Sequence, residues 1–164
     1  MFRNRATLAA SAILATAFAA SPAVASSPSL GAGQPAPARA AGAGPAKIQL
    51  RRTSLGEVLV DGRGFTVYAF SRDGRRKDRC VMTQGCSVVW PAIRTSGAPR
   101  AGRGVKRSLL ATIRISGGAT QVTYAGHPLY HYSGDASPGS TDYVGVSQFR
   151  GVWRALRPSG ALAG

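Results

Sequence analysis

Two tyrosine–aspartate pairs stand out among the residues of this chain that could do chemistry. Tyr68 precedes Asp73 by five positions, and the same spacing separates Tyr130 from Asp135. Phenol hydroxyls and carboxylates together suit the hydroxyl groups of a sugar, and a carboxylate also suits a cation. An aspartate where a strand ends can equally accept backbone N–H groups and fix a turn, or accept a tyrosine hydroxyl. The spacing therefore predicts either a pair of ligand sites or two structural turns.

The chain has two histidines, and His131 lies inside the second pair. If His127 and His131 share one strand, their even spacing places them on the same side. With Asp135 they would then offer ligands that suit a divalent metal such as zinc or copper. Four strand residues span roughly 13 Å, however, which is too far for one ion without a bend. We therefore expect surface or hydrogen-bonded histidines, no metal site and no cofactor.

A basic cluster follows the first tyrosine. Its members are Arg72, Arg75, Arg76, Lys77 and Arg79. Paired guanidinium hydrogen bonds would let these side chains bind an anion. The alternative is a solvated charged loop, and the sequence leaves both open.

No catalytic motif is recognisable in the chain. It lacks a Gly-x-Ser-x-Gly elbow, a His-Glu-x-x-His motif, a phosphate loop and a dinucleotide fingerprint. Its six acidic residues are scattered and suggest no general acid–base pair. We therefore predict that the protein is not an enzyme.

Cys80 and Cys86 are the only two cysteines. In an exported chain such a pair predicts a disulfide. The loop between them is short, so the chain-entropy model gives a stabilisation of about 2 kcal/mol. The spacing is not the Cys-x-x-Cys of thioredoxin-like redox sites, and two thiols alone do not complete a zinc site.

The first 25 residues have the features of a secretion signal. Arg3 and Arg5 precede an apolar run over residues 8–20, and Ala23-Val24-Ala25 has the small-x-small pattern of a cleavage site. The apolar run is too short to span a bilayer as a helix, although a retained anchor is the alternative. Cleavage after Ala25 predicts a secreted or periplasmic protein with no transmembrane segment.

Composition divides the rest of the chain into three parts. Residues 26–46 are almost entirely Ala, Pro, Gly and Ser, which predicts a disordered linker. Residues 47–158 suffice for one domain with a modest core, and we expect it to be a monomer. Residues 159–164 are predicted to be a tail.

The elements that would hold the two pairs are repeated. The segment from Tyr68 to Asp73 recurs from Tyr130 to Asp135, and landmarks around both copies are shifted by 62 or 63 residues. A glycine-bearing turn precedes each copy and a tryptophan follows it, at Trp90 and Trp153. We place the repeats at about 50–93 and 112–158.

Strand patterns outnumber helical patterns throughout the predicted domain. Alternating and β-branched runs, separated by glycine turns, predict antiparallel hairpins. Residues 86–91 are ambiguous, with half a helical turn that ends at Pro91 as one interpretation, and a single turn is the interpretation of residues 108–111. No segment carries the three or four turns of amphipathic pattern that a longer helix needs. The predicted fold class is a small all-β domain.

Charge is the other strong feature of the composition. The chain has 21 Lys and Arg against six Asp and Glu, a formal net charge of +15. Such a surface attracts phosphate, acidic polysaccharide or anionic lipid head groups. No recognisable nucleic-acid module is present, so we expect acidic envelope polymers or an anionic lipid surface as partners, and no specific nucleic acid.

As a set, these motifs resemble a group of exported bacterial proteins. They are the predicted lipoproteins that carry a "secreted repeat of unknown function", with a Tyr-x4-Asp core. The most specific stretch is residues 121–130, and the resemblance covers about 50–158. It implies an exported, mostly β domain of unassigned activity. Many members carry a lipid-attachment cysteine after the signal peptide, whereas Ser26 stands there in this chain, so we expect no lipid anchor.

The sequence thus favours an exported, non-enzymatic domain that binds or scaffolds at the cell envelope through a basic surface. The alternative is a small-ligand or metal site in the second repeat, with or without catalytic activity. That site would use Tyr130, His131 and Asp135, with His127 nearby.

Overall fold

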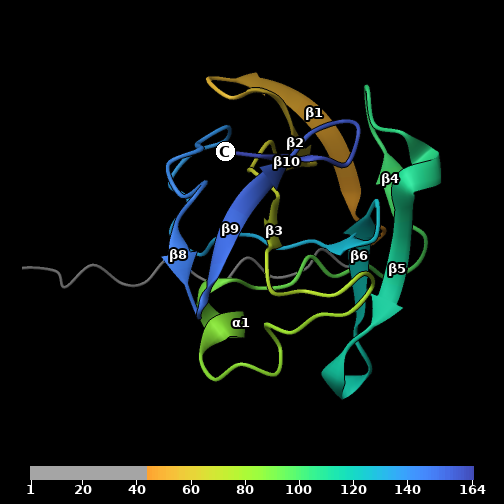
Figure 1. Cartoon of the computed structure of the whole chain (residues 1–164). Helices are drawn as coiled ribbons and strands as arrows, with labels where there is room; N and C mark the ends of the chain where they lie inside the picture. The colour runs from red at the N-terminus through yellow and green to blue at the C-terminus, as the bar shows by residue number, and fades with distance from the viewer. Residues whose placement is uncertain (1–43) are drawn as a thin grey trace, which may run out of the picture. The chain divides into compact units, whose positions relative to one another are not determined.

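The computed structural model describes residues 44–164, shown in colour in Figure 1. The predicted signal peptide and nearly all of the predicted linker lie outside these residues. Ten strands, one four-residue helix and two 3-10 turns make up the regular structure of the described part. The predicted all-β class is therefore confirmed. None of the helices in residues 44–164 could cross a bilayer.

The first sheet comes from the first half of the domain, which we define as residues 47–101. Strand β1 (Lys47–Thr53) pairs antiparallel with β2 (Gly56–Asp61). Strand β4 (Arg100–Ala101) adds to the other edge of β1 in parallel. The apolar run of β2 is buried on both faces, which explains why it does not alternate.

A matching sheet comes from the second half, residues 110–163. Strands β5 (Leu110–Arg114), β6 (Thr120–Tyr124) and β7 (His127–Pro128) form an antiparallel sheet in that order. Two 3-10 turns, η1 (Arg107–Leu109) and η2 (Ser116–Gly118), flank β5. The first of these overlaps the helical turn expected at 108–111.

The remaining sheet joins the halves. Strand β3 (Tyr68–Phe70) pairs with β9 (Gly151–Leu156), so Phe70 lies opposite Trp153. Strands β8 (Ser147–Gln148) and β10 (Leu162–Ala163) also pair with β9, and β10 lies within the predicted tail. Helix α1 (Cys86–Val89) agrees with the helical interpretation of residues 86–91.

Corresponding segments of the two halves make the same backbone hydrogen bonds. In the first match, Val67 N donates to Leu59 O and Leu129 N donates to Val122 O. In the second, Ser71 N donates to Val152 O and Ser133 N donates to Val89 O. In the third, Gly139 N donates to Gly64 O and Arg76 N donates to Gly126 O. The second and third of these matches cross from one half to the other. The two halves are therefore interlocked with an approximate twofold relation.

Two large apolar clusters fill the space between these sheets, and a smaller third one consists of Val58, Ala155 and Ala163. One is aliphatic and lies between the β1–β2 and β5–β6 hairpins, with Ile48, Leu59 and Val122 fully buried. The other is aromatic and includes both tryptophans, Tyr68, Tyr130 and the two cysteines. The tyrosines of the two predicted sites therefore belong to the core.

Candidate functional site

Tyr68 and Tyr130 lie side by side where the halves meet. The backbone N–H of Tyr68 donates to the carbonyl of Tyr130 at 2.9 Å, and the N–H of Tyr130 donates back at 3.0 Å. This is the hydrogen-bonded type of antiparallel pair. The structure thus pairs the first residues of both Tyr-x4-Asp segments directly.

The two tyrosine–aspartate pairs are exchanged between the halves. The hydroxyl of Tyr68 donates to Asp135 Oδ1 at 3.1 Å, and that of Tyr130 donates to Asp73 Oδ2 at 2.7 Å. The sequence indicated that each aspartate could accept a tyrosine hydroxyl. The hydroxyl it accepts comes from the other repeat.

Asp73 also stabilises the backbone on both sides of it, from Phe70 to Arg79. Its Oδ1 accepts the backbone N–H of Arg79 at 2.8 Å, and its own N–H donates to Phe70 O at 3.0 Å. Burial raises the pKa of Asp73 to about 7, with a contribution from Asp78, although the bonds from Arg79 and Tyr130 act in the opposite direction. This carboxyl group therefore titrates near neutral pH.

Burial likewise raises the pKa of both tyrosines. The neighbouring carboxylates, Asp135 for Tyr68 and Asp73 for Tyr130, add to that increase. Both phenols therefore stay protonated at neutral pH and act as donors. They are not poised as nucleophiles or bases.

The two tryptophans stack at the centre of the aromatic cluster. Their ring centroids are 3.9 Å apart with an interplanar angle of 2°. Phe70 stacks on the outer face of Trp153, and Tyr132 packs on Trp90, so four rings lie in one column. Tyr68 meets Trp90 edge-on, and Tyr130 meets Trp153 in the same way. The repeated aromatic residues thus form the packing between the halves.

His131 contacts the first half through Asp61. Its Nε2 lies 3.2 Å from Asp61 Oδ2, while the backbone N–H groups of Arg63 and Phe65 donate to Oδ1. Burial alone would raise the pKa of Asp61, but the bond from His131 and those backbone donors outweigh it and lower the pKa to about 2. The carboxylate thus holds the turn after β2 against the second repeat.

The other histidine lies apart from this contact, at the start of β7. Burial lowers the pKa of His127, and the neighbouring Arg75 adds to that effect. Within residues 44–164 no group of three or more His, Cys, Asp or Glu side chains is placed to hold a metal ion. The metal site considered for the second repeat therefore has no ligand set in the described part.

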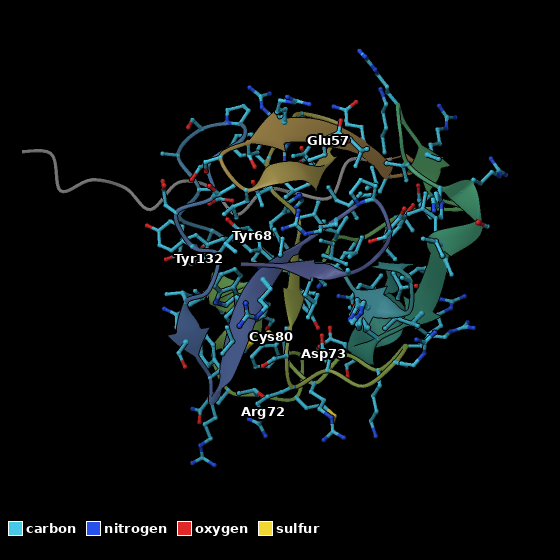
Figure 2. All side chains as sticks on the ribbon, turned by 45° about the horizontal axis from the view of Figure 1, so that its top comes forward. Glu57, Tyr68, Arg72, Asp73, Cys80 and Tyr132 are labelled. Atoms are coloured by element: carbon cyan, nitrogen blue, oxygen red, sulfur yellow. A yellow bond between two sulfur atoms is a disulfide. The ribbon has the colours of Figure 1, made fainter. Side chains whose placement is uncertain are left out.

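The basic cluster lies on an exposed loop that the second half helps to hold. Arg72 donates from its guanidinium to Phe149 O at 3.1 Å, and the backbone N–H of Arg76 donates to Gly126 O at 2.7 Å. Lys77 and Gly74 close a tight turn between them. Figure 2 shows Arg72 at the periphery, with Asp73 and Cys80 further inside. All five basic side chains of the cluster are exposed.

The predicted disulfide between Cys80 and Cys86 is confirmed. The two Cα atoms are 5.3 Å apart, and both residues are fully buried in the aromatic cluster. Cys86 begins α1, which leads directly to Trp90. The bond therefore helps to position Trp90 for stacking.

Two features of the surface and core were not predicted. Gln148 Oε1 accepts the indole N–H of Trp90 at 2.8 Å. A groove of about 730 Å³ runs along β5 and is lined by Arg76, Arg107 and Arg114. These arginines come from separate segments, so no contiguous motif marks the groove in the sequence.

The comparison with known families agrees with the resemblance noted in the sequence. Residues 111–157 match the family model described as a secreted repeat of unknown function. The matched segment runs from β5 to the end of β9, which is most of the second half. No curated protein and no solved structure matches the chain.

Proposed function

We propose that this secreted-repeat chain is a non-enzymatic domain that binds acidic polymers or anionic lipid head groups of the cell envelope. The observation that carries the proposal is an excess of exposed basic side chains that lack acidic partners among residues 44–164.

Most of the carboxylates are used inside the fold. Asp61, Asp78 and Asp135 are buried, and Asp73 is partly buried against Tyr130. Only Glu57 and Asp142 remain as exposed acidic residues between positions 44 and 164. Most of the carboxylates are therefore held in internal contacts and do not lie beside the basic side chains of the surface.

The basic side chains have the opposite distribution. Arg3, Arg5 and Arg39 precede the described part, which leaves 18 of the 21 Lys and Arg residues within it. Of these 18, Arg63 alone makes an ion pair with another described residue, its neighbour Asp61. Side chains with blue nitrogen tips extend outward around the periphery in Figure 2. Arg72, Arg114 and Arg157 each donate one hydrogen bond to a backbone carbonyl. The remaining guanidinium donors are available to carboxylate, sulfate or phosphate.

Salt-dependent retention tests the proposal. We expect the protein to bind a heparin column and to co-sediment with vesicles that contain anionic lipid at low salt. Binding to heparin and binding to vesicles should both weaken as salt shortens the Debye length from roughly 30 Å at 0.01 M to about 8 Å at 0.15 M. Failure to bind at low salt, or binding that salt does not weaken, would refute the proposal. Neutral dextran and vesicles of neutral lipid are the controls.

Charge-preserving variants separate general attraction from a specific anion site. Arg52, Arg79 and Arg103 are exposed and make no ion pair with described residues. Changing all three to Gln should lower the salt concentration needed for elution. Changing them to Lys should restore it, because attraction between a basic surface and a polymer depends on charge.

The alternative, a small-ligand site at Tyr130, His131 and Asp135, has less support. Each of these residues already contacts a residue of the first half, so a ligand would have to displace those contacts. It predicts that sugars or divalent ions raise the melting temperature. A screen without any such shift would remove this alternative.

A further inference from the structure

The outer edge of β1 is covered by a segment of the same chain. The N–H of Arg100 donates to Ala46 O at 2.8 Å, that of Gly102 donates to Ile48 O at 2.6 Å, and that of Leu50 donates to Arg103 O at 3.2 Å. These bonds satisfy alternate backbone groups along β1, as a parallel neighbour does. The first half therefore has no open edge at β1.

The corresponding edge of β5 has no such cover in the described residues. Strand β5 is the end strand of its sheet, and it lies on the right in Figure 1. The bonds from Ala125 N to Leu109 O and from Ile115 N to Ala119 O fix which residues of β5 face β6. By alternation, the backbone groups of Thr112 and Arg114 point away from β6.

The segment that could have covered this edge lies elsewhere. Strand β10 follows β5 in the second half as β4 follows β1 in the first, with Arg100 and Leu162 separated by 62 positions. A turn at residues 157–161 folds β10 back onto β9 instead. The near-twofold relation between the halves breaks at this point, so the outer edge of β5 has no partner strand among the described residues.

The groove that β5 lines is strongly basic. Its lining includes every residue of β5, Thr120 at the start of β6, the loop at residues 97–99, and Arg76, Arg107 and Arg114. Among residues 44–164, none of the acidic ones lines it. Five strand residues span roughly 17 Å, which suits an added segment of five or six residues.

We propose that the β5 edge binds an extended acidic peptide segment of a partner protein as an additional strand. The backbone of the segment would pair with Leu110 O and with the N–H and C=O of Thr112 and Arg114, and its carboxylates would meet the three arginines. Strand addition of this kind derives affinity from main-chain hydrogen bonds and specificity from side chains. A second copy of this chain is a poorer occupant, because its own arginines would face these three.

Amide hydrogen exchange tests the pairing directly. The probe is a blocked eight-residue peptide of alternating valine and glutamate. In the free protein the amides of Thr112 and Arg114 should exchange much faster than those of Ala111 and Ile113, which bond to β6. Saturating peptide should slow exchange at Thr112 and Arg114 at least roughly tenfold, the protection expected of a newly formed ladder. Binding without protection of these two amides would overturn the inference.

Two peptide controls identify what is recognised. The same peptide with N-methyl groups on alternate amide nitrogens loses its ladder donors and should bind weakly. A peptide with lysine in place of glutamate should not bind. If polyglutamate without strand-forming residues binds equally well and protects neither amide, the strand-addition inference fails while the proposed polymer binding stands.

Matched variants test the role of the groove arginines. The triple change Arg76→Gln, Arg107→Gln and Arg114→Gln should weaken the peptide Kd by roughly tenfold or more, as expected for three partly exposed ion pairs. The triple change Arg52→Gln, Arg79→Gln and Arg150→Gln removes the same charge at exposed positions outside the groove and should have a much smaller effect. Equal losses in the two variants would overturn the inference.

Protection of Thr112 and Arg114 in the absence of peptide would also contradict it. If that protection increases with protein concentration, a second copy occupies the edge. Sedimentation of the free protein at the same concentrations identifies this outcome.

Discussion

Tyr130 donates its hydroxyl hydrogen bond to Asp73, which lies 57 positions earlier in the chain, at 2.7 Å. The counterpart bond, from Tyr68 to Asp135, joins residues 67 positions apart. Both bonds therefore cross between the halves and sit beside the backbone pair of Tyr68 and Tyr130. Long-range bonds of this kind can be tested one partner at a time.

Replacing Tyr130 with Phe should destabilise the fold by about 1–3 kcal/mol, because Asp73 loses a donor in a partly buried site. The double variant Tyr130→Phe with Asp73→Asn should cost less than the sum of the two single changes. Urea denaturation of the wild type and the three variants measures the coupling. Strictly additive losses would show that the bond contributes no pairwise stability.

The pH dependence of stability should change direction below neutrality. Asp61 has a pKa of about 2 in the folded state, below its ordinary value of 3.8, so the unfolded state binds more protons between those values and stability rises with pH. Asp73 has a folded pKa of about 7, so from about pH 4 to pH 7 the folded state binds more protons and stability falls with pH.

Asp73→Asn should remove the decline between pH 4 and pH 7 while leaving the rise at lower pH. The measurement is the free energy of unfolding from urea melts at half-unit pH intervals. A decline of the same size in the Asp73→Asn variant would assign it to another group.

Reduction of the disulfide should lower stability by about 2 kcal/mol, the value expected for so short a loop. The double variant Cys80→Ser with Cys86→Ser should match the reduced wild type in thermal melts. Because α1 leads into Trp90, reduction should also shift the tryptophan fluorescence. A melting temperature that does not respond to reductant would contradict this prediction.

Replacing Gln148 with Leu should cost about 1–2 kcal/mol, because the indole N–H of Trp90 loses its acceptor. Ser147→Ala, at the exposed neighbour on β8, is the matched control and should be nearly neutral. Thermal unfolding compares the two variants. A loss of equal size in both would indicate that β8 itself, and not the bond to Trp90, is responsible.

Local features were predictable from the sequence because the residues that form them are close along the chain. The turn after β2 is an example: Gly64 adopts a φ of +91°, and the N–H of Asp61 donates to Phe65 O across the turn. The disulfide was predictable because the chain offers only two cysteines. The end of the helical turn at α1 was predictable from the proline that follows it at position 91.

The partners of the two aspartates were not predictable. Both repeats carry a tyrosine and an aspartate at the same spacing, so the sequence cannot distinguish bonds within a repeat from bonds between repeats. The contact between His131 and Asp61 is non-local in the same way. Strand β10 has only two residues and no alternating pattern, so its pairing with β9 has no sequence signature.

The exchanged bonds have a consequence for how such a molecule could have arisen. Each half contributes one phenol donor and one carboxylate acceptor to these two bonds, and each donor bonds to the acceptor of the other half. A polypeptide with a single repeat would therefore reach the same packing only by associating with an identical copy, at a stability that depends on its concentration. Joining two copies end to end makes that association intramolecular, so the paired state persists at any dilution.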